Sequence, residues 1–203
     1  MFILSIYISN IMKKLSFVLL LSVLFIGCQS NAQKKSDINV QNEKMAVAQP
    51  DLAKNHTFPV QKTDDEWKKL LTPAQYNILR EAGTEIPRSS DLLHIEGKGV
   101  FLCAACDNPL YLNKDQFVSG TGWPSFDQPI KDGVVLGTDE KLGYSRDEVV
   151  CARCGGHIGH RFNDGPKETT GLRYCMNGAA MTFIPADTKS VEEIIEEHKI
   201  AKN

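Results

Sequence analysis

The sequence predicts a mainly β fold: two antiparallel sheets in a small sandwich or barrel-like core, with short N-terminal helices and a C-terminal helix. Two observations lead to this prediction. Apolar residues with helical spacing are confined to residues 63–83 and to the C-terminal end. Between these regions, short apolar runs alternate with Gly, Asn, Asp and Pro, which is typical of strands joined by turns.

Two short helices are predicted to open the folded region. Thr63 or Asp64 can cap the first, because the side-chain oxygen accepts a hydrogen bond from a backbone N–H of the first turn. The apolar face of this helix is formed by Trp67, Leu70 and Leu71. Thr72 is expected to cap the second helix, with Pro73 at its first position and Gly83 at its end.

The strands are predicted from apolar runs that follow a loop at 85–93. These runs are "GVFLC", "GVVLG", "EVVC" and "MTFIP", at 99–103, 133–137, 148–151 and 181–185. Ser190 and Glu193 then form a capping-box pattern, which predicts a final helix over "SVEEIIEEHKIAK". Its charged residues are expected to face solvent.

The N-terminal end has the pattern of an export signal. Two lysines precede the apolar run "LSFVLLLSVLFIG", and Cys28 follows at the place of the lipidated cysteine in a bacterial lipobox. We predict a signal peptide over 1–27, with the start at Met1 or Met12. The alternatives are a transmembrane anchor or a secreted protein cut elsewhere, but the run is shorter than the ~20 residues that a span needs.

The rest of the chain divides into two parts. Residues 28–60 are predicted to be the lipidated cysteine and a flexible tether, because the segment is rich in Gln, Asn, Lys and Ser. Residues 61–203 are predicted to form the globular domain. We expect the protein to be exported and held by its lipid on a bacterial membrane, on the periplasmic side. Which membrane carries the anchor is left open.

The composition is that of a soluble globular domain. Charged residues make up 24% and hydrophobic residues 42% of the chain, which are ordinary fractions. The formal net charge of -2 argues against a nucleic-acid binder, which usually carries a basic excess. We therefore expect a protein that binds no nucleic acid. Separately, we expect it to be a monomer.

Four cysteines come in two CxxC pairs, which is typical of a structural zinc site. Cys103 and Cys106 form one pair, and Cys151 and Cys154 form the other. Each two-residue spacer lets both sulfurs point at one centre, so two pairs supply the four ligands of a tetrahedral Zn²⁺. Disulfides are an alternative in an exported protein. A thioredoxin-type redox motif is less well supported, because neither pair opens a helix in a βαβ pattern.

Cys175 has no partner cysteine nearby. A leftover thiol is either reactive or a small buried apolar residue, and cysteine arithmetic alone does not separate the two. Arg173 and Asn177 lie two residues to either side, so a strand would place all three side chains on one face. A nearby guanidinium favours the thiolate form, which is the nucleophile.

Three further residues are candidates for a site. His157 and His160 in "HIGH" are interpreted as a general acid or an orienting donor, with metal ligation and burial in the core as alternatives. Trp123 lies between glycine and proline in "SGTGWPSF", in a turn that can present its indole to a methyl group or thioether. A core position is the alternative.

Several long motifs resemble those of one enzyme family. "FVSGTGWPSF", "CARCGGHIGHRFNDGP" and "TGLRYCMNGAAM" are similar to motifs of the MsrB-type peptide methionine-R-sulfoxide reductases, and "CAAC" matches their first zinc pair. The resemblance covers residues 62–185 in the family's motif order. It implies a fold of two antiparallel sheets with N-terminal helices.

The resemblance also implies roles for individual residues. Cys175 corresponds to the nucleophile, with His157, His160 and Asn177 as polar groups beside it. Trp123 corresponds to the residue that packs against the substrate methyl, and Arg173 to an arginine near the nucleophile. The zinc ligands would be the paired cysteines: Cys103, Cys106, Cys151 and Cys154.

The implied function is repair of oxidised proteins. Cys175 would attack the sulfur of methionine-R-sulfoxide, with His160 as proton donor and His157 assisting, and would become a sulfenic acid. Many members carry a cysteine where this chain has Thr121, so the sulfenic acid would be reduced directly by an external thiol such as a thioredoxin-like protein. Arg161 and Gly178 also depart from the common pattern.

Two alternatives stay open. One is a zinc-stapled binding module in which Cys175 is structural, and the other is an enzyme that acts on free methionine sulfoxide. The identity of the electron donor is left open as well.

Overall fold

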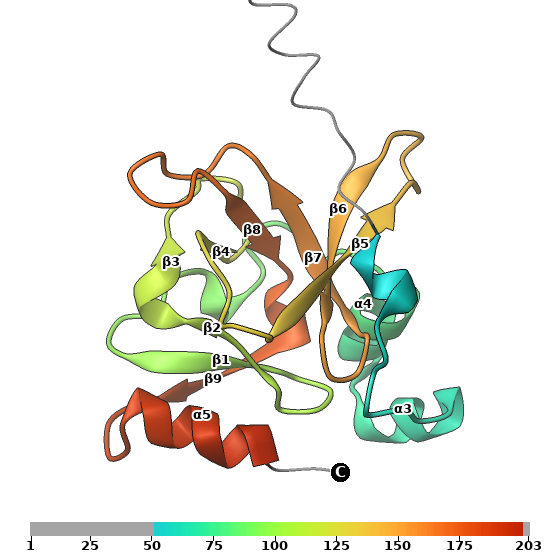
Figure 1. Cartoon of the computed structure of the whole chain (residues 1–203), viewed down its shortest axis with the longest axis horizontal. Coiled ribbons are helices and arrows are strands. Elements are labelled where there is room, and N and C mark those ends of the chain that lie inside the picture. The colour runs from blue at the N-terminus through green and yellow to red at the C-terminus, as the bar shows by residue number, and fades with distance from the viewer. Residues whose placement is uncertain (1–50, 201–203) are drawn as a thin grey trace, which may run out of the picture. The chain divides into compact units, whose positions relative to one another are not determined.

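A computed structural model describes residues 51–200 of the chain (Figure 1). The predicted signal peptide, Cys28 and most of the predicted tether lie outside these residues. Within the described range, no helix is both long and apolar enough to cross a bilayer.

The two predicted N-terminal helices are confirmed, each with a capping box. Helix α3 (Asp64–Leu70) begins after Thr63, whose hydroxyl accepts the Glu66 N–H while the Glu66 carboxylate accepts the Thr63 N–H. Helix α4 (Pro73–Glu81) begins after Thr72 in the same way, with Gln75 as the reciprocal partner. These bonds satisfy backbone donors that the first turn of a helix leaves free.

Two details of these helices differ from the prediction. Leu70 was expected on the apolar face but is 61% exposed, because α3 ends there and the core is reached by Trp67 and by Leu71 beyond the helix end. The left-handed residue that ends α4 is Ala82, not Gly83. Gly83 packs closely against the side-chain amide of Asn77, which would have to move to make room for a Cβ at this position.

The strands form two antiparallel sheets, as predicted. The three-stranded sheet has the order β2-β1-β9, with β1 (Gly99–Cys103), β2 (Pro109–Leu112) and β9 (Met181–Pro185). The six-stranded sheet has the order β3-β4-β8-β7-β6-β5. Its strands are β3 (Gln116–Phe117), β4 (Ser125–Phe126), β5 (Val134–Asp139), β6 (Arg146–Cys151), β7 (His157–Phe162) and β8 (Arg173–Met176). The sheets pack as a sandwich rather than a closed barrel.

Several strands carry no apolar run, and the sequence did not mark them. Strands β3 and β4 have two residues each, too few for a pattern. Strand β7 reads "HIGHRF", in which glycine and polar residues hide the alternation. Short 3-10 helices η1 (Leu52–Asn55), η2 (Asp91–Leu93), η3 (Asn113–Asp115) and η4 (Gly178–Ala180) complete the described elements.

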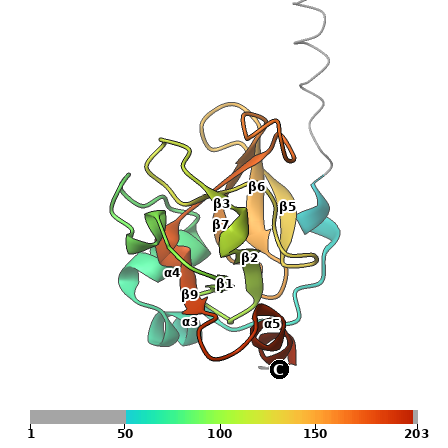
Figure 2. The same ribbon diagram turned by 90° about the vertical axis from the view of Figure 1, so that its left-hand side faces the viewer.

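Strand β1 lies between two layers and is buried on both faces. Phe101 and Cys103 point into the main core between the sheets, and Val100 and Leu102 point to the opposite side. There they meet Ile194 of α5 (Val191–Ile200), the predicted C-terminal helix, which is capped by Ser190 and Glu193. Figures 1 and 2 show α5 against the three-stranded sheet, away from α3 and α4.

Ordered contacts begin earlier in the chain than the sequence predicts. The segment 51–60, assigned to the tether, lies against the second CxxC loop. Nε2 of His56 is 2.8 Å from the Ala152 carbonyl, and the Val60 N–H donates to the Arg153 carbonyl at 2.9 Å. Helix η1 covers the edge strand β5, where a Cβ on Gly137 would lie 3.3 Å from Cβ of Ala53.

Candidate active site and metal centre

The four paired cysteines meet in one buried cluster, and two loops of the same shape bring them there. In the first loop the Asp107 N–H donates to the Cys103 carbonyl at 2.8 Å. In the second the Gly155 N–H donates to the Cys151 carbonyl at 2.9 Å. Asp107 and Gly155 are both left-handed, with φ of 56° and 69°. This tight turn points both sulfurs of a pair the same way.

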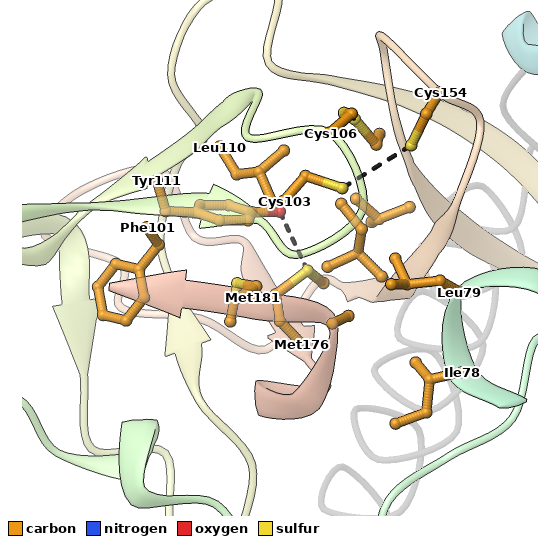
Figure 3. Close-up of a cluster of buried hydrophobic side chains, with 14 of the residues drawn as sticks. Ile78, Leu79, Phe101, Cys103, Cys106, Leu110, Tyr111, Cys154, Met176 and Met181 are labelled. Atoms are coloured by element: carbon orange, nitrogen blue, oxygen red, sulfur yellow. Dashed lines mark hydrogen bonds between the residues drawn. The ribbon is translucent and has the colours of Figure 1, made fainter. Parts of the chain in front are cut away.

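The sulfur positions fit a tetrahedral metal ion. The Cys103 and Cys154 sulfurs are 3.8 Å apart (Figure 3). The sulfurs of Cys106 and Cys151 are 3.6 Å apart. All four sulfurs lie within 4.8 Å of one another. A tetrahedron with Zn–S bonds of ~2.3 Å has S···S edges of about 3.8 Å, whereas a disulfide needs ~2.05 Å. The disulfide alternative is therefore wrong for these cysteines, which are all free.

One row of side chains crosses the six-stranded sheet and carries the second cluster. Cys175 on β8 lies directly opposite Ser125 on β4 and His160 on β7, and His160 lies opposite Glu148 on β6. Directly opposite residues share a face and touch across antiparallel strands. The residues of β8 that point the opposite way, Tyr174 and Met176, enter the core, where the Tyr111 hydroxyl donates to the Met176 sulfur at 3.1 Å (Figure 3).

A β-bulge brings the second histidine to the same face. Residues three apart on a regular strand lie on opposite faces, which would separate His157 from His160. In β7 the pairing shifts by one residue, because Val149 faces Gly159 while Val150 faces His157, so Ile158 is the extra residue. The two imidazole rings are 5.2 Å apart, centroid to centroid.

Each histidine is held by a carboxylate. Nδ1 of His157 is 2.7 Å from Oε1 of Glu148, and Nε2 of His160 is 2.7 Å from Oδ2 of Asp139. Nε2 of His157 is buried and has no hydrogen-bond partner among the described residues. Nδ1 of His157 faces the Glu148 carboxylate. The buried Nε2 is therefore the second ring nitrogen that can carry a proton.

The Asp139–His160 pair is ionised at aspartate and neutral at histidine. Burial acts to raise the pKa of Asp139, but hydrogen bonds from Lys141 and His160 and the charge of Arg146 lower it to about 2. The pKa of His160 is lowered too, because burial outweighs the hydrogen bond to Asp139. An ionised carboxylate only accepts, so Nε2 of His160 carries the proton and Nδ1 is free to accept one.

Cys175 is free and half-buried, but it is not ionised at rest. Burial raises the pKa of its thiol, and the positive charge of Arg173 and a contact with Thr121 offset this only in part. Arg173 does favour the thiolate, as the sequence suggested, but removing the thiol from water penalises the charged form more than this one guanidinium favours it. A proton acceptor must take the thiol proton before Cys175 can attack.

Arg173 lies on the same face of β8 as Cys175, as predicted. Its guanidinium makes a forked ion pair with Asp164, with both N···O distances 2.9 Å, and lies 4.4 Å above the Phe162 ring. These contacts fix the positive charge two residues from the thiol. Oγ1 of Thr121 is 3.9 Å from the Cys175 sulfur, so this residue does lie where a second cysteine would meet the first.

The remaining two candidates, Trp123 and Asn177, both border the end of β8. Trp123 is half-buried rather than in the core, and it borders β8 because the Met176 N–H donates to the Pro124 carbonyl at 2.9 Å. Asn177 is only 4% exposed. Its side-chain NH₂ donates to the Ile158 carbonyl at 2.9 Å, and its Oδ1 accepts the Glu85 N–H at 3.0 Å. Asn177 therefore joins the end of β8 to β7 and to the loop after α4.

Sequence reasoning missed the acidic partners of the site. Glu148 opens the predicted run "EVVC", and a carboxylate inside a predicted strand is a signal that could have been used. Asp139 and Asp164 lie in stretches with no such pattern. Gly178, noted as a departure from the resembled family, is explained by packing: a Cβ there would lie 1.8 Å from Oγ of Ser90.

Comparisons with known proteins agree with this arrangement. The SelR domain family matches residues 71–185. The chain is similar to a protein named peptide methionine sulfoxide reductase MsrB from Leptospira interrogans, with 50% identity over 127 residues, 62% of this chain and 96% of the relative. Proteins of the same name from Agrobacterium fabrum and Methanosarcina barkeri are also 50% identical, over 93% and 87% of their lengths.

Proposed function

The chain belongs to the SelR domain family of peptide methionine sulfoxide reductases, and from this premise we propose that it reduces methionine-R-sulfoxide in proteins through Cys175. One observation carries the proposal. A free thiol lies directly opposite a neutral histidine that is held by an ionised aspartate. This arrangement can take the thiol proton and return it to a leaving oxygen.

The first step is removal of the thiol proton. His160 accepts it at Nδ1, and the imidazolium that forms is stabilised by the Asp139 carboxylate at Nε2. Arg173 stabilises the thiolate left at Cys175. His157, held by Glu148, lies against His160 and assists as a second polar group.

The second step transfers oxygen. The Cys175 thiolate attacks the sulfoxide sulfur and forms an S–S bond, and His160 returns the proton to the oxygen. The oxygen then moves to the Cys175 sulfur, so that a new O–S bond forms there while the S–S bond and the bond between oxygen and the methionine sulfur break. Methionine leaves, and the oxygen remains on Cys175 as a sulfenic acid. One thiol and one sulfoxide thus give one sulfenic acid and one thioether, so atoms and electrons balance.

The side chains around Cys175 supply the chirality. We propose that the indole of Trp123 contacts the substrate methyl on one side, while the histidines receive the oxygen on the other. Asn177 holds the turn behind Cys175, and we assign it a positioning role.

An external thiol restores the enzyme. Thr121 lies beside Cys175 but carries a hydroxyl, so it cannot form a disulfide, and the other described cysteines belong to the metal cluster. Two thiols of a thioredoxin-like protein would convert the sulfenic acid to thiol, water and their own disulfide.

We propose zinc as the ion of the four-cysteine cluster. Four thiolates and a closed, buried site are the ligand set that structural zinc prefers. When bound, the ion would offset part of the charge of the four thiolates and link β1 to the β6–β7 loop. We further propose the export and lipid anchor predicted for residues 1–60, with the catalytic domain over 61–203.

The test of the function is a stereospecific assay. The protein with dithiothreitol as reductant is expected to reduce a peptide that contains methionine-R-sulfoxide and to leave the S epimer unchanged. Chromatography of the two separated epimers measures this. Equal rates for both epimers, or no reduction of either, would contradict the proposal.

The pH dependence should follow the two shifted groups. The thiol pKa of Cys175 is raised, and His160 must be neutral to accept the thiol proton. We therefore expect kcat/KM to increase with pH and to keep increasing at pH values above the ordinary thiol pKa of ~8.5.

Asp139→Asn removes the charge that stabilises the imidazolium and should lower kcat/KM about tenfold to hundredfold.

Asp147→Asn is the matched control, because Asp147 lies on the same hairpin but pairs with Arg161. Asp147→Asn should leave kcat/KM nearly unchanged. If Asp139→Asn and Asp147→Asn lowered kcat/KM equally at neutral pH, the role assigned to Asp139 would be contradicted.

The Asp139 carboxylate has a lowered pKa, so its contribution to stability is present above pH ~4 and is lost as the pH falls toward about 2.

A further inference from the structure

Glu85 lies between two walls of the candidate site, although no sequence motif marked it. It belongs to the loop after α4 and is half-buried, whereas its neighbours Thr84 and Ile86 are exposed. In sequence it is 38 residues from Trp123 and 92 residues from Asn177. The fold nevertheless brings both residues into contact with it.

The carboxylate of Glu85 holds the turn that follows the nucleophile strand. Oε1 accepts the Gly178 N–H at 2.7 Å, and Oε2 accepts the Ala179 N–H at 2.8 Å. Hydrogen bonds to a charged acceptor are shorter and about twice as strong as neutral ones. This turn begins three residues after Cys175, so the carboxylate fixes where the end of β8 lies.

The backbone of Glu85 holds both side chains. Its N–H donates to Oδ1 of Asn177 at 3.0 Å, and its carbonyl accepts the indole N–H of Trp123 at 3.2 Å. The indole is therefore anchored at one edge, and its position is tied to the position of the turn. A shift of Glu85 moves both walls relative to Cys175.

We propose that Glu85 is a positioning residue, which fixes the Trp123 indole relative to the turn after Cys175 and thereby sets the discrimination between the R and S epimers. The proposal rests on the function proposed above. Glu85 touches no reacting atom. It acts through Trp123, whose distance from the sulfoxide decides whether the methyl group or the oxygen fits beside it.

Glu85→Gln tests the role of the carboxylate with little change in size. The amide offers one acceptor oxygen, so one of the two backbone N–H groups would face an NH₂ donor. We expect kcat/KM for the R epimer to fall about tenfold, mainly through KM, because the indole and the turn are displaced by a fraction of an ångström. We expect the ratio of R to S turnover to fall with it.

Glu96→Gln is the matched control, because Glu96 is an exposed glutamate after η2. It should leave KM and the epimer ratio unchanged. A merely structural role of Glu85 would lower activity in proportion to the unfolded fraction, with KM and the epimer ratio as in wild type. That result, measured beside a thermal unfolding curve, would overturn the proposal.

A second measurement does not depend on activity. The chain has two tryptophans, so a ¹H–¹⁵N spectrum contains two indole N–H signals, from Trp67 and Trp123. Glu85→Gln should shift the Trp123 indole and Asn177 amide signals and leave the Trp67 indole in place. Unchanged Trp123 and Asn177 signals would overturn the positioning role, even in a protein that proves to have no reductase activity. An inactive wild type would instead refute the proposed function alone.

Discussion

Replacing Cys175 with serine is expected to lower kcat/KM for methionine-R-sulfoxide by more than about 10³-fold, because a hydroxyl at neutral pH is a poor nucleophile and forms no sulfenic acid. The substitution keeps the size and hydrogen bonding of the side chain, so the sheet row of Ser125, Cys175 and His160 should persist. Turnover of the purified variant with dithiothreitol measures the effect.

The control for this variant is its stability and metal content, which should match those of wild type because Cys175 lies outside the metal cluster. Labelling with iodoacetamide gives an independent check. The wild type should be alkylated at Cys175, faster as the pH rises, since the reactive form is the thiolate. Retained turnover in the serine variant, or an unreactive Cys175 in wild type, would favour a zinc-stapled binding module in which this cysteine is structural.

Replacing Cys151 with serine is expected to unfold much of the domain. Zinc bound to four cysteines contributes about 10–16 kcal/mol in small zinc-binding peptides, which is comparable to the whole stability of a typical domain of ~5–15 kcal/mol. The cluster joins β1 of one sheet to the β6–β7 loop of the other, so loss of one ligand loosens the sandwich at this end. Thermal unfolding and metal analysis measure the outcome.

The Cys175→Ser protein is again the matched control, since it removes a thiol without touching the cluster. Wild type should contain about one zinc per chain, and a chelator should lower its unfolding temperature. A Cys151→Ser variant as stable as wild type would show that packing alone holds the two loops. Purified wild type without metal would contradict the assignment of the cluster.

Local signals in the sequence predicted the helices well. Thr63, Thr72 and Ser190 each cap a helix as expected, because a capping box lies within four consecutive residues. The position of Leu70 was not predictable in this way. Its exposure depends on where α3 meets the sheets, and helical spacing alone does not contain that information.

The meeting of the four paired cysteines in one cluster was also predictable, and Cys175 could be singled out as a candidate nucleophile, but the surroundings of both could not be foreseen. A CxxC turn carries its own geometry, so four cysteines in two pairs already indicate one centre. By contrast, the pairs His160–Asp139 and His157–Glu148 form only after β5, β6 and β7 align. The bulge at Ile158, which turns both histidines to one face, has no mark in the sequence. Glu85 reaches the site from the loop after α4, by contacts that pattern analysis cannot foresee.

The cover that η1 gives to β5 has a consequence for association between molecules. An exposed edge strand offers unpaired backbone groups on which another chain can add a strand and begin to aggregate. Strand β5 is one outer strand of the six-stranded sheet, and Ala53 of η1 lies against Gly137 near its middle. The other outer strand, β3, has only two residues, too short to serve as a template. The short β3 rim is thus poorly suited to growth by strand addition, and at β5 an added strand would also have to fit beside η1, which packs on the adjoining face.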